Sequence, residues 1–146
     1  MNMKRIGIAA DHAGYALKET LKRRLISDGY EVTDFGTDSE QSMDYPDTAH
    51  PLAVSVENGE SEVGIIICGS GNGVNMTVNK HQGIRGALCW KAECAHLARL
   101  HNDSNIVAIP ARFISQQEAF EIVEAFLSTE FEGGRHLNRI NKIPNK

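Results

Sequence analysis

Several features that this chain lacks limit what it can be. None of its apolar runs approaches the ~18 consecutive apolar residues of a membrane span, which argues against a membrane protein. The apolar part of the N-terminus already ends at Asp11, which is too short for a secretion signal. Three cysteines, Cys68, Cys89 and Cys94, form no even disulfide framework, so we expect a reducing, cytoplasmic setting. The net charge of −4 provides no basic surface for nucleic acid, and we expect neither a nucleic-acid nor a membrane partner.

Apolar runs and helical segments alternate along the whole chain. The run 63–68 is continuously apolar between turn formers, as in the fully buried strands of a parallel sheet. Leucines recur every four positions from residue 17, which is typical of an amphipathic helix, and Ser115 with Glu118 has a capping-box pattern. The predicted strands are 4–10, 31–35, 63–68, 84–89 and 105–110, and helices are predicted over 15–28, from 45, from 73, over 91–101 and over 115–128. This alternation predicts a mostly parallel sheet covered by helices on both faces.

Polar residues follow three of the predicted strands. Asp11 and His12 come after the first strand, residues 68–73 end the third, and Arg112 follows the fifth. Ligands of open parallel sheets bind at the carboxyl ends of the strands. We therefore expect these residues to meet at one edge of the sheet.

The segment Cys68-Gly69-Ser70-Gly71-Asn72-Gly73 places a thiol directly before three alternating glycines. Such a loop allows successive backbone N–H groups to point at an anion or an oxyanion. It matches neither a P-loop, which ends in Gly-Lys-Ser/Thr, nor the Gly-x-Gly-x-x-Gly dinucleotide motif. A thiol phosphatase of the Cys-x5-Arg type would need arginine where Val74 stands. A helix N-terminus beside Cys68 favours the thiolate, so Cys68 is a candidate base or nucleophile; the alternatives are a structural cysteine and a turn without a ligand.

Histidines and arginines supply further candidates. His12 follows the first strand and His101 ends a predicted helix, and histidine is the usual proton carrier near neutral pH, although many loop histidines are merely solvated. Arg135 and Arg139 are four residues apart, so on a helix they share a face that could grip a phosphate; otherwise they belong to a solvated basic tail. The cysteine and histidines around His96 do not have zinc-ligand spacing, and we predict no metal site.

Seven short motifs occur in order along the chain. They are Asp11-His12-Ala13-Gly14, Asp44-Tyr45-Pro46, Ile67-Cys68-Gly69-Ser70-Gly71-Asn72-Gly73, Asn79-Lys80, Gly83-Ile84-Arg85, His101-Asn102-Asp103 and Glu132-Gly133-Gly134-Arg135-His136. Together they resemble the ribose-5-phosphate isomerase B family, which also includes the galactose-6-phosphate isomerase subunits. The resemblance extends from about residue 4 to about residue 140. It implies a Rossmann-like three-layer α/β/α sandwich with a five-stranded, mostly parallel sheet, in one sugar-phosphate isomerase domain over 1–146.

The resemblance also implies a reaction. The expected activity is interconversion of D-ribose 5-phosphate and D-ribulose 5-phosphate through an enediolate, in the non-oxidative branch of the pentose phosphate pathway, without metal or organic cofactor. Cys68 matches the family's base, and His101 matches the histidine that assists opening of the sugar ring. Some relatives carry a glutamate base where this chain has Val74, which leaves Cys68 as the candidate. Substrate-binding positions are matched by Asp11, His12, Gly69, Ser70, Gly71, Asn72, Gly73, Asn102, Arg112, Arg135 and Arg139.

The expected partner, besides the sugar phosphate, is a second copy of the chain. The resemblance implies a homodimer or homotetramer with the active site at the subunit interface, where the regions of His101 and Arg112 face the Cys68 loop of the partner. The basic tail, about 131–146, is expected to contribute to phosphate binding and dimer contacts. Two alternatives stay open at this point. One is a hexose-6-phosphate isomerase acting on allose or galactose 6-phosphate, and the other is a non-catalytic sugar-phosphate sensor, which would not need Cys68 or His101 for proton transfer.

Overall fold

A parallel sheet lies at the centre of the molecule, for which the computed structural model describes residues 4–145. Its strands are β1 (Arg5–Ala10), β2 (Glu31–Asp34), β3 (Val63–Cys68), β4 (Gly86–Leu88) and β5 (Ile106–Pro110). They are arranged in the order β2-β1-β3-β5-β4, and every neighbouring pair is parallel. The sheet is therefore wholly parallel, and all the carboxyl ends of its strands lie at one edge.

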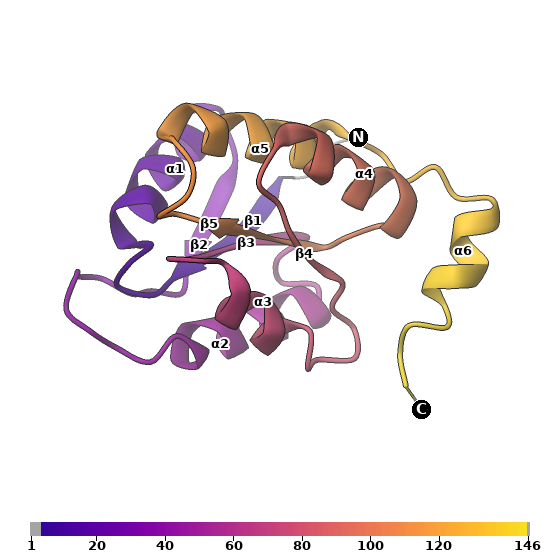
Figure 1. Ribbon diagram of the computed structural model, residues 1–146, viewed down its shortest axis with the longest axis horizontal. Coiled ribbons are helices and arrows are strands. Elements are labelled where there is room, and N and C mark those ends of the chain that lie inside the picture. The colour runs from indigo at the N-terminus through magenta and orange to yellow at the C-terminus, as the bar shows by residue number, and fades with distance from the viewer. Residues whose placement is uncertain (1–3, 146) are drawn as a thin grey trace.

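Helices cover both faces of this sheet. They are α1 (Tyr15–Ser27), α2 (Pro46–Glu57), α3 (Asn72–Val78), α4 (Ala92–Asn102), α5 (Gln116–Ser128) and α6 (Arg135–Ile140). Figure 1 shows α1, α4 and α5 on one face and α2 with α3 on the other, while α6 stands apart beside α4. The predicted three-layer α/β/α sandwich is confirmed. None of the helices in residues 4–145 has the length and apolar character needed to cross a membrane.

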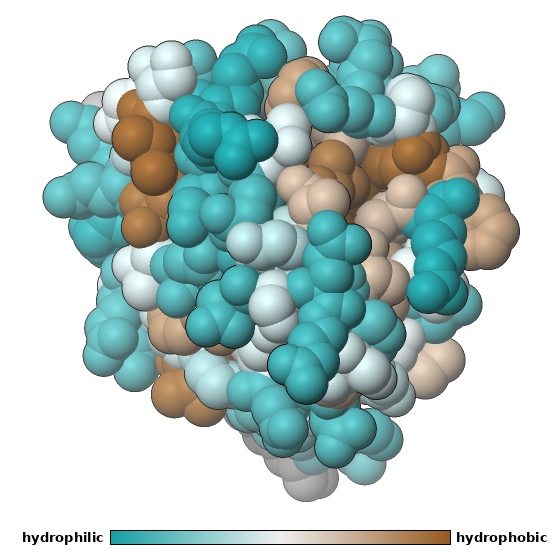
Figure 2. All heavy atoms as spheres, turned by 90° about the vertical axis from the view of Figure 1, so that its left-hand side faces the viewer, coloured by the Kyte–Doolittle hydropathy of each residue, from teal (hydrophilic) through white to brown (hydrophobic). Residues whose placement is uncertain are grey.

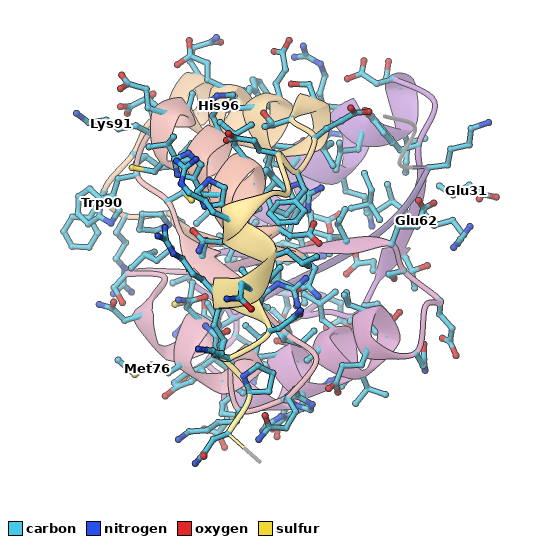
Figure 3. The ribbon with its side chains drawn as sticks, turned by 90° about the vertical axis from the view of Figure 1, so that its right-hand side faces the viewer. Glu31, Glu62, Met76, Trp90, Lys91 and His96 are labelled. Atoms are coloured by element: carbon cyan, nitrogen blue, oxygen red, sulfur yellow. The ribbon has the colours of Figure 1, made fainter. Side chains whose placement is uncertain are left out.

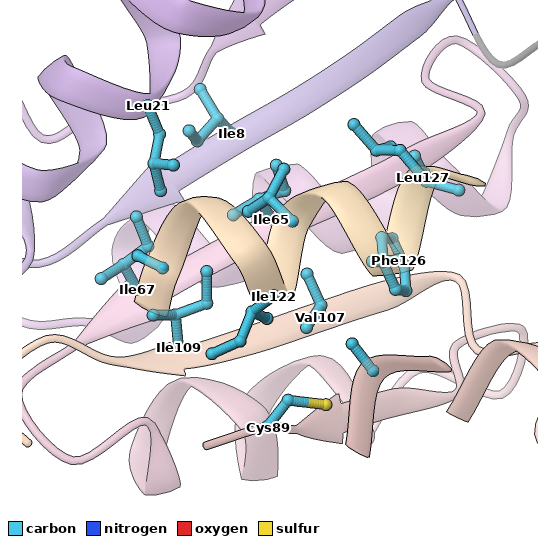
Figure 4. Packing of buried hydrophobic residues seen from close by; sticks show 14 of the residues in the cluster. Ile8, Leu21, Ile65, Ile67, Cys89, Val107, Ile109, Ile122, Phe126 and Leu127 are labelled. Carbon is cyan, nitrogen blue, oxygen red and sulfur yellow. The ribbon is translucent and has the colours of Figure 1, made fainter. Parts of the chain in front are cut away.

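The two helical layers bury alternate residues of the central strands. Because successive side chains of a strand point to opposite faces, Ile65 and Ile67 of β3 pack with α1, α4 and α5, as Figure 4 shows for the α5 side. Ile66 and Cys68 instead belong to the cluster under α2 and α3. All six residues of β3 are buried. The position of Cys68 at the end of this strand therefore fixes both its depth and the layer that it faces.

Local sequence signals account for the starts of α2 and α5. Pro46 begins α2 as predicted, and the predicted capping box of α5 is present: the N–H of Glu118 donates to Ser115 Oγ at 3.1 Å, and the N–H of Ser115 donates to Glu118 Oε1 at 2.8 Å. The fourth strand is shorter than predicted, 86–88 in place of 84–89. It is an edge strand that pairs only with β5, and at residue 85 the backbone N–H bonds to the side chain of Asn105 at 2.8 Å.

Candidate active site

Three neighbouring strands bring the predicted polar residues together at the carboxyl edge of the sheet. The register places Ala10 of β1 beside Ile67 of β3, and Cys68 beside Pro110 of β5. Beyond the strands, the N–H of Asp11 donates to the carbonyl of Ile67 at 3.1 Å, and the N–H of Arg112 donates to the carbonyl of Gly69 at 3.0 Å. The expectation that Asp11, the Cys68 loop and Arg112 share one edge is confirmed.

The thiol of Cys68 is buried, and its orientation is set by the loop that follows. Only 5% of the residue is exposed, and the backbone N–H of Gly71 donates to its sulfur at 3.1 Å. Gly71 has a φ of +76°, a left-handed conformation that suits glycine far better than other residues. The positive φ turns the chain back toward the sulfur directly before α3, so the glycine is needed for this contact.

The glycine loop uses some of its N–H groups internally and leaves others free. Besides the Gly71 N–H on the sulfur, the N–H of Asn72 donates to Ser70 Oγ at 3.2 Å. Within the described residues, the N–H groups of Gly69, Ser70 and Gly73 have no hydrogen-bond acceptor. These three are therefore the loop donors that a negatively charged ligand could still use.

The side chains around the loop come from separate elements. A Cβ on Gly69 would lie 3.1 Å from the guanidinium of Arg112, so the arginine covers the loop of its own chain. The aromatic ring of Tyr45, just before α2, lies against Gly73 in the same way: a Cβ on Gly73 would be 2.6 Å from this ring. Sequence reasoning placed Tyr45 in a motif without giving it a role. The only sequence feature that indicated its position was the neighbouring Pro46, which marks the start of α2 directly after Tyr45.

The placement of Arg112 differs from one expectation. The resemblance implied that the region of Arg112 faces the Cys68 loop of a partner chain, whereas this side chain lies on Gly69 of its own loop. The reason is topological. Arg112 lies two residues beyond the end of β5, and β5 pairs with β3, so the two strand ends are neighbours within one chain.

Asp11 and His12 line the same edge beside β1. Asp11 is buried, and its carboxylate accepts a hydrogen bond from the N–H of Gly14 at 3.0 Å, which holds the loop between β1 and α1. The Nδ1 atom of His12 accepts a hydrogen bond from the N–H of Met43 at 3.3 Å. In the neutral ring this contact leaves the proton on Nε2, so His12 offers a hydrogen-bond donor at its far side.

His101, Asn102, Arg135 and Arg139 lie at the opposite edge of the sheet. Helix α4 follows β4 and runs back to the start of β5, so its last turn, with His101 and Asn102, lies at the amino ends of the strands. The N–H of Gly64 donates to the carbonyl of Asn105 at this end. Cys68 lies four residues beyond Gly64 along β3, which corresponds to about 13 Å at about 3.3 Å per residue.

Helix α6 is held at the same amino edge. The N–H of Glu132 donates to the carbonyl of Leu100 at 2.9 Å, which ties the segment before α6 to α4. Figure 3 looks onto this edge, with α6 in front of the sheet. Arg135 and Arg139 are exposed and, among the described residues, form no ion pair. One chain therefore presents the predicted site residues as two separate groups, one at each edge of the sheet.

Glu132 and His136 belong to the last of the seven sequence motifs, and the resemblance implies no role for either residue. In the structure both lie beside His101: the ring of His136 stacks on that of His101 with centroids 4.4 Å apart, and Glu132 Oε2 lies 3.8 Å from His101 Nε2. The only sequence signal for them was their closeness to Arg135. Their contact with His101 depends on the packing of α6 against α4.

Comparison with known proteins agrees with this architecture. The family model described as Ribose/Galactose Isomerase matches residues 6–143. The chain is 41% identical over 141 residues to ribose-5-phosphate isomerase B of Escherichia coli, covering 97% of this chain and 95% of the relative. It is 42% identical over 139 residues to the probable ribose-5-phosphate isomerase B of Mycoplasma pneumoniae, covering 94% of this chain and 91% of the relative.

Solved structures are equally similar. The ribose 5-phosphate isomerase of Thermotoga maritima superposes with a TM-score of 0.95 at 48% identity, covering 99% of both chains. The ribose-5-phosphate isomerase B of Mycoplasma genitalium, solved with bound ribulose-5-phosphate, superposes with a TM-score of 0.90 at 41% identity, covering 94% of this chain and 92% of the other.

Proposed function

The chain belongs to the ribose/galactose isomerase family, and from that membership we propose that it interconverts D-ribose 5-phosphate and D-ribulose 5-phosphate. Relatives named ribose-5-phosphate isomerase match nearly its full length, and one of them has been solved with bound ribulose-5-phosphate. The observation that carries the proposal is the buried thiol of Cys68 directly beside a loop with free N–H groups. Aldose–ketose isomerisation needs this pair: a base for a carbon-bound proton, and donors for the oxygen that becomes negative.

Cys68 is the proposed base. As a thiolate, its sulfur removes the proton from C2 of the open-chain aldose, and the electron pair of the broken C–H bond forms a double bond between C1 and C2. The C1 oxygen takes up the negative charge as an enediolate. A proton then passes from O2 to O1. The negative oxygen O2 forms the carbonyl bond to C2, and the electron pair of the C1–C2 double bond takes up the proton that the thiol delivers to C1. General acid–base groups of this kind contribute roughly 10²–10⁴ in rate.

The glycine loop stabilises the enediolate in this proposal. The N–H groups of Gly69, Ser70 and Gly73 are free to donate, whereas those of Gly71 and Asn72 are engaged in holding the sulfur and the turn. Removing one well-placed donor from an oxyanion site typically costs about 3–4 kcal/mol of transition-state stabilisation. Gly69, covered by Arg112, belongs to the same loop, and Asp11 and His12, which follow the neighbouring strand, contact the sugar in this proposal.

A second copy of the chain supplies the remaining groups. His101, which assists ring opening, and Asn102, Arg135 and Arg139, which bind the sugar and its phosphate, lie at the opposite edge of the sheet from Cys68. In a two-fold symmetric dimer, the amino edge of one chain can meet the carboxyl edge of its partner. The basic tail then contributes both phosphate binding and dimer contacts.

The side of the molecule next to β4 is the proposed dimer surface. Met76, Trp90 and Phe113 are 65%, 45% and 57% exposed, and the rings of Trp90 and Phe113 contact each other at 5.2 Å. Figure 3 labels Met76 and Trp90 on one side of the molecule, and Figure 2, which faces the carboxyl edge, shows an apolar area extending to its right-hand margin. Exposed apolar clusters of this kind mark interaction surfaces.

An isomerase assay on the wild type and on Cys68→Ala tests the proposal. With ribose 5-phosphate as substrate, we expect the variant to lose at least ~100-fold in turnover. The matched control is Cys94→Ala, because Cys94 is exposed on α4 and should be dispensable. Unchanged turnover in Cys68→Ala would remove Cys68 as the base. Faster conversion of allose 6-phosphate by the wild type would contradict the pentose assignment, and binding without conversion would indicate a sensor.

A further inference from the structure

Two histidines and one glutamate converge at the amino edge of the sheet. His101 comes from the last turn of α4, Glu132 from the segment before α6, and His136 from the first turn of α6. Glu132 Oε2 lies 3.8 Å from His101 Nε2 and 3.6 Å from His136 Nε2. One donor atom from each of the three side chains lies within 4.8 Å of the other two. The three residues are close in space although 31 to 35 positions separate His101 from the other two in the sequence.

His136 is the buried member of this cluster. Its side chain is 8% exposed, and no group in the described part of the chain hydrogen-bonds to its Nε2 atom. A buried polar atom without a hydrogen bond is unusual in a folded protein and calls for a partner. A neutral imidazole nitrogen carries either a proton or a lone pair. The missing partner of Nε2 is therefore a hydrogen-bonding group or a metal ion.

We propose that His101, Glu132 and His136 bind a divalent transition metal ion, with Zn²⁺ as the first candidate. Two imidazole nitrogens and one carboxylate oxygen are a common ligand set for zinc, with the fourth position left open. Ligands about 2.1 Å from a tetrahedral ion lie roughly 3.4 Å from each other. The two separations from Glu132, 3.6 and 3.8 Å, are only a few tenths of an ångström too long, and the third, between the two histidines, lies within 4.8 Å.

The adjustment falls on the exposed members of the site. The rings of His101 and His136 are close to parallel, with 17° between their planes, so one must turn before both lone pairs point at the same ion. His101 and Glu132 are 38% and 44% exposed, which leaves both free to move toward the buried ring. Their exposure also leaves the fourth ligand position open to solvent.

A second group of the same residue types shows why convergence matters. His50 Nδ1 bonds to His81 Nε2 at 2.7 Å, and His81 Nδ1 bonds to Glu57 at 2.9 Å. These residues form a chain in which the nitrogens of His81 are already hydrogen-bonded, so their atoms do not face a common point. This group supplies a control with the same chemistry and a different geometry.

Metal binding at this site does not depend on the proposed function, but its expected consequence does. If His101 assists ring opening, an ion on its Nε2 removes the group that must reach the sugar. Zn²⁺ should then inhibit the isomerase, and a chelator should restore the activity. The site would then make the enzyme reversibly inhibited by the metal ion.

Zinc titration of the full chain tests the site directly. Competition with a chromophoric chelator measures binding, and an isomerase assay on the same samples measures inhibition. We expect the wild type and His50→Gln to bind one Zn²⁺ per chain, and Glu132→Gln and His136→Asn to bind at least ~10-fold more weakly. Glu132 is exposed, so its variant stays interpretable if loss of the buried ring of His136 prevents folding, which circular dichroism would detect.

The outcomes separate the metal site from the proposed function. Unchanged zinc affinity in Glu132→Gln overturns the site, and so does zinc binding that disappears in Cys68→Ala, because the ion would then occupy the thiol. An active isomerase that binds no zinc overturns the metal site alone. A wild type that binds zinc through Glu132 and His136 but converts no ribose 5-phosphate keeps the metal site and removes the proposed function.

Discussion

Two inactive variants should produce an active enzyme when they are mixed, if each active site takes groups from two chains. Cys68 and His101 lie at opposite edges of one sheet, and between these edges β3 rises about 13 Å from Gly64 to Cys68, at about 3.3 Å per residue. A single chain therefore does not bring the two groups to one substrate. Cys68→Ala and His101→Asn each damage both sites of their own homodimer, because every site contains one altered group.

The expected activity of the mixture follows from two-fold symmetry. In a dimer of one chain with Cys68→Ala and one with His101→Asn, one site combines the intact Cys68 with the intact His101, and the other site carries both changes. Random pairing of equal amounts makes half of the dimers mixed. The mixture should therefore reach about one quarter of the wild-type turnover per chain, against roughly 1% or less for each variant alone if each group contributes ~100-fold.

The assay is co-refolding of the two variants in equal amounts, followed by steady-state turnover of ribose 5-phosphate. A matched control mixes His101→Asn with Arg135→Ala, whose residues lie at the same edge, so that no site becomes complete and no activity returns. A mixture of Cys68→Ala and His101→Asn that stays at the level of its parents would refute the shared site. Mixing Cys68→Ala with Arg112→Ala should also fail, because Arg112 covers Gly69 of its own chain; recovery there would move Arg112 to the partner's site.

Three further outcomes can be measured on the purified chain. Gly71→Ala should lower the free energy of unfolding by about 1–3 kcal/mol in urea melts, because φ is +76°, and should also reduce turnover; unchanged stability would contradict the required left-handed turn. Burial raises the pKa of the Cys89 thiol to about 12, so at pH 7.5 iodoacetamide should modify the exposed Cys94 while Cys89 stays unmodified. Mass spectrometry of digests measures the modification of each cysteine, and faster modification of Cys89 than of Cys94 would contradict this expectation. Burial alone would raise the pKa of Asp34, but hydrogen bonds from Lys18 and Lys22 outweigh the effect of burial and lower this pKa. Its contribution to stability is present above about pH 3.8 and is lost as the pH falls through the lowered pKa; melts of Asp34→Asn should lack this acid-dependent loss, and an equal loss would refute the assignment.

Local patterns in the sequence predicted most of the fold. The continuous apolar run of β3, the leucine spacing of α1 and the capping box of α5 each depend on residues a few positions apart, and each was confirmed. The predicted length of strand β4 was too long, because its pairing with β5 covers only 86–88 and the N–H of Arg85 bonds to the side chain of Asn105, a contact that no local signal marks. The insertion of β5 between β3 and β4 was likewise not predictable from hydrophobic periodicity.

The sequence by itself determined the chemical groups of this protein: a thiol before a glycine loop, a histidine at a helix end and two arginines on one helical face. It also determined that residues after β1, β3 and β5 meet, because parallel strands direct their carboxyl ends to one edge. The order strand, helix, strand in a parallel sheet also places the end of α4, with His101, at the opposite edge, because the helix must run back to the amino end of β5. Only the tertiary structure decided that Glu132 and His136 contact His101, because this contact depends on packing between residues distant in sequence.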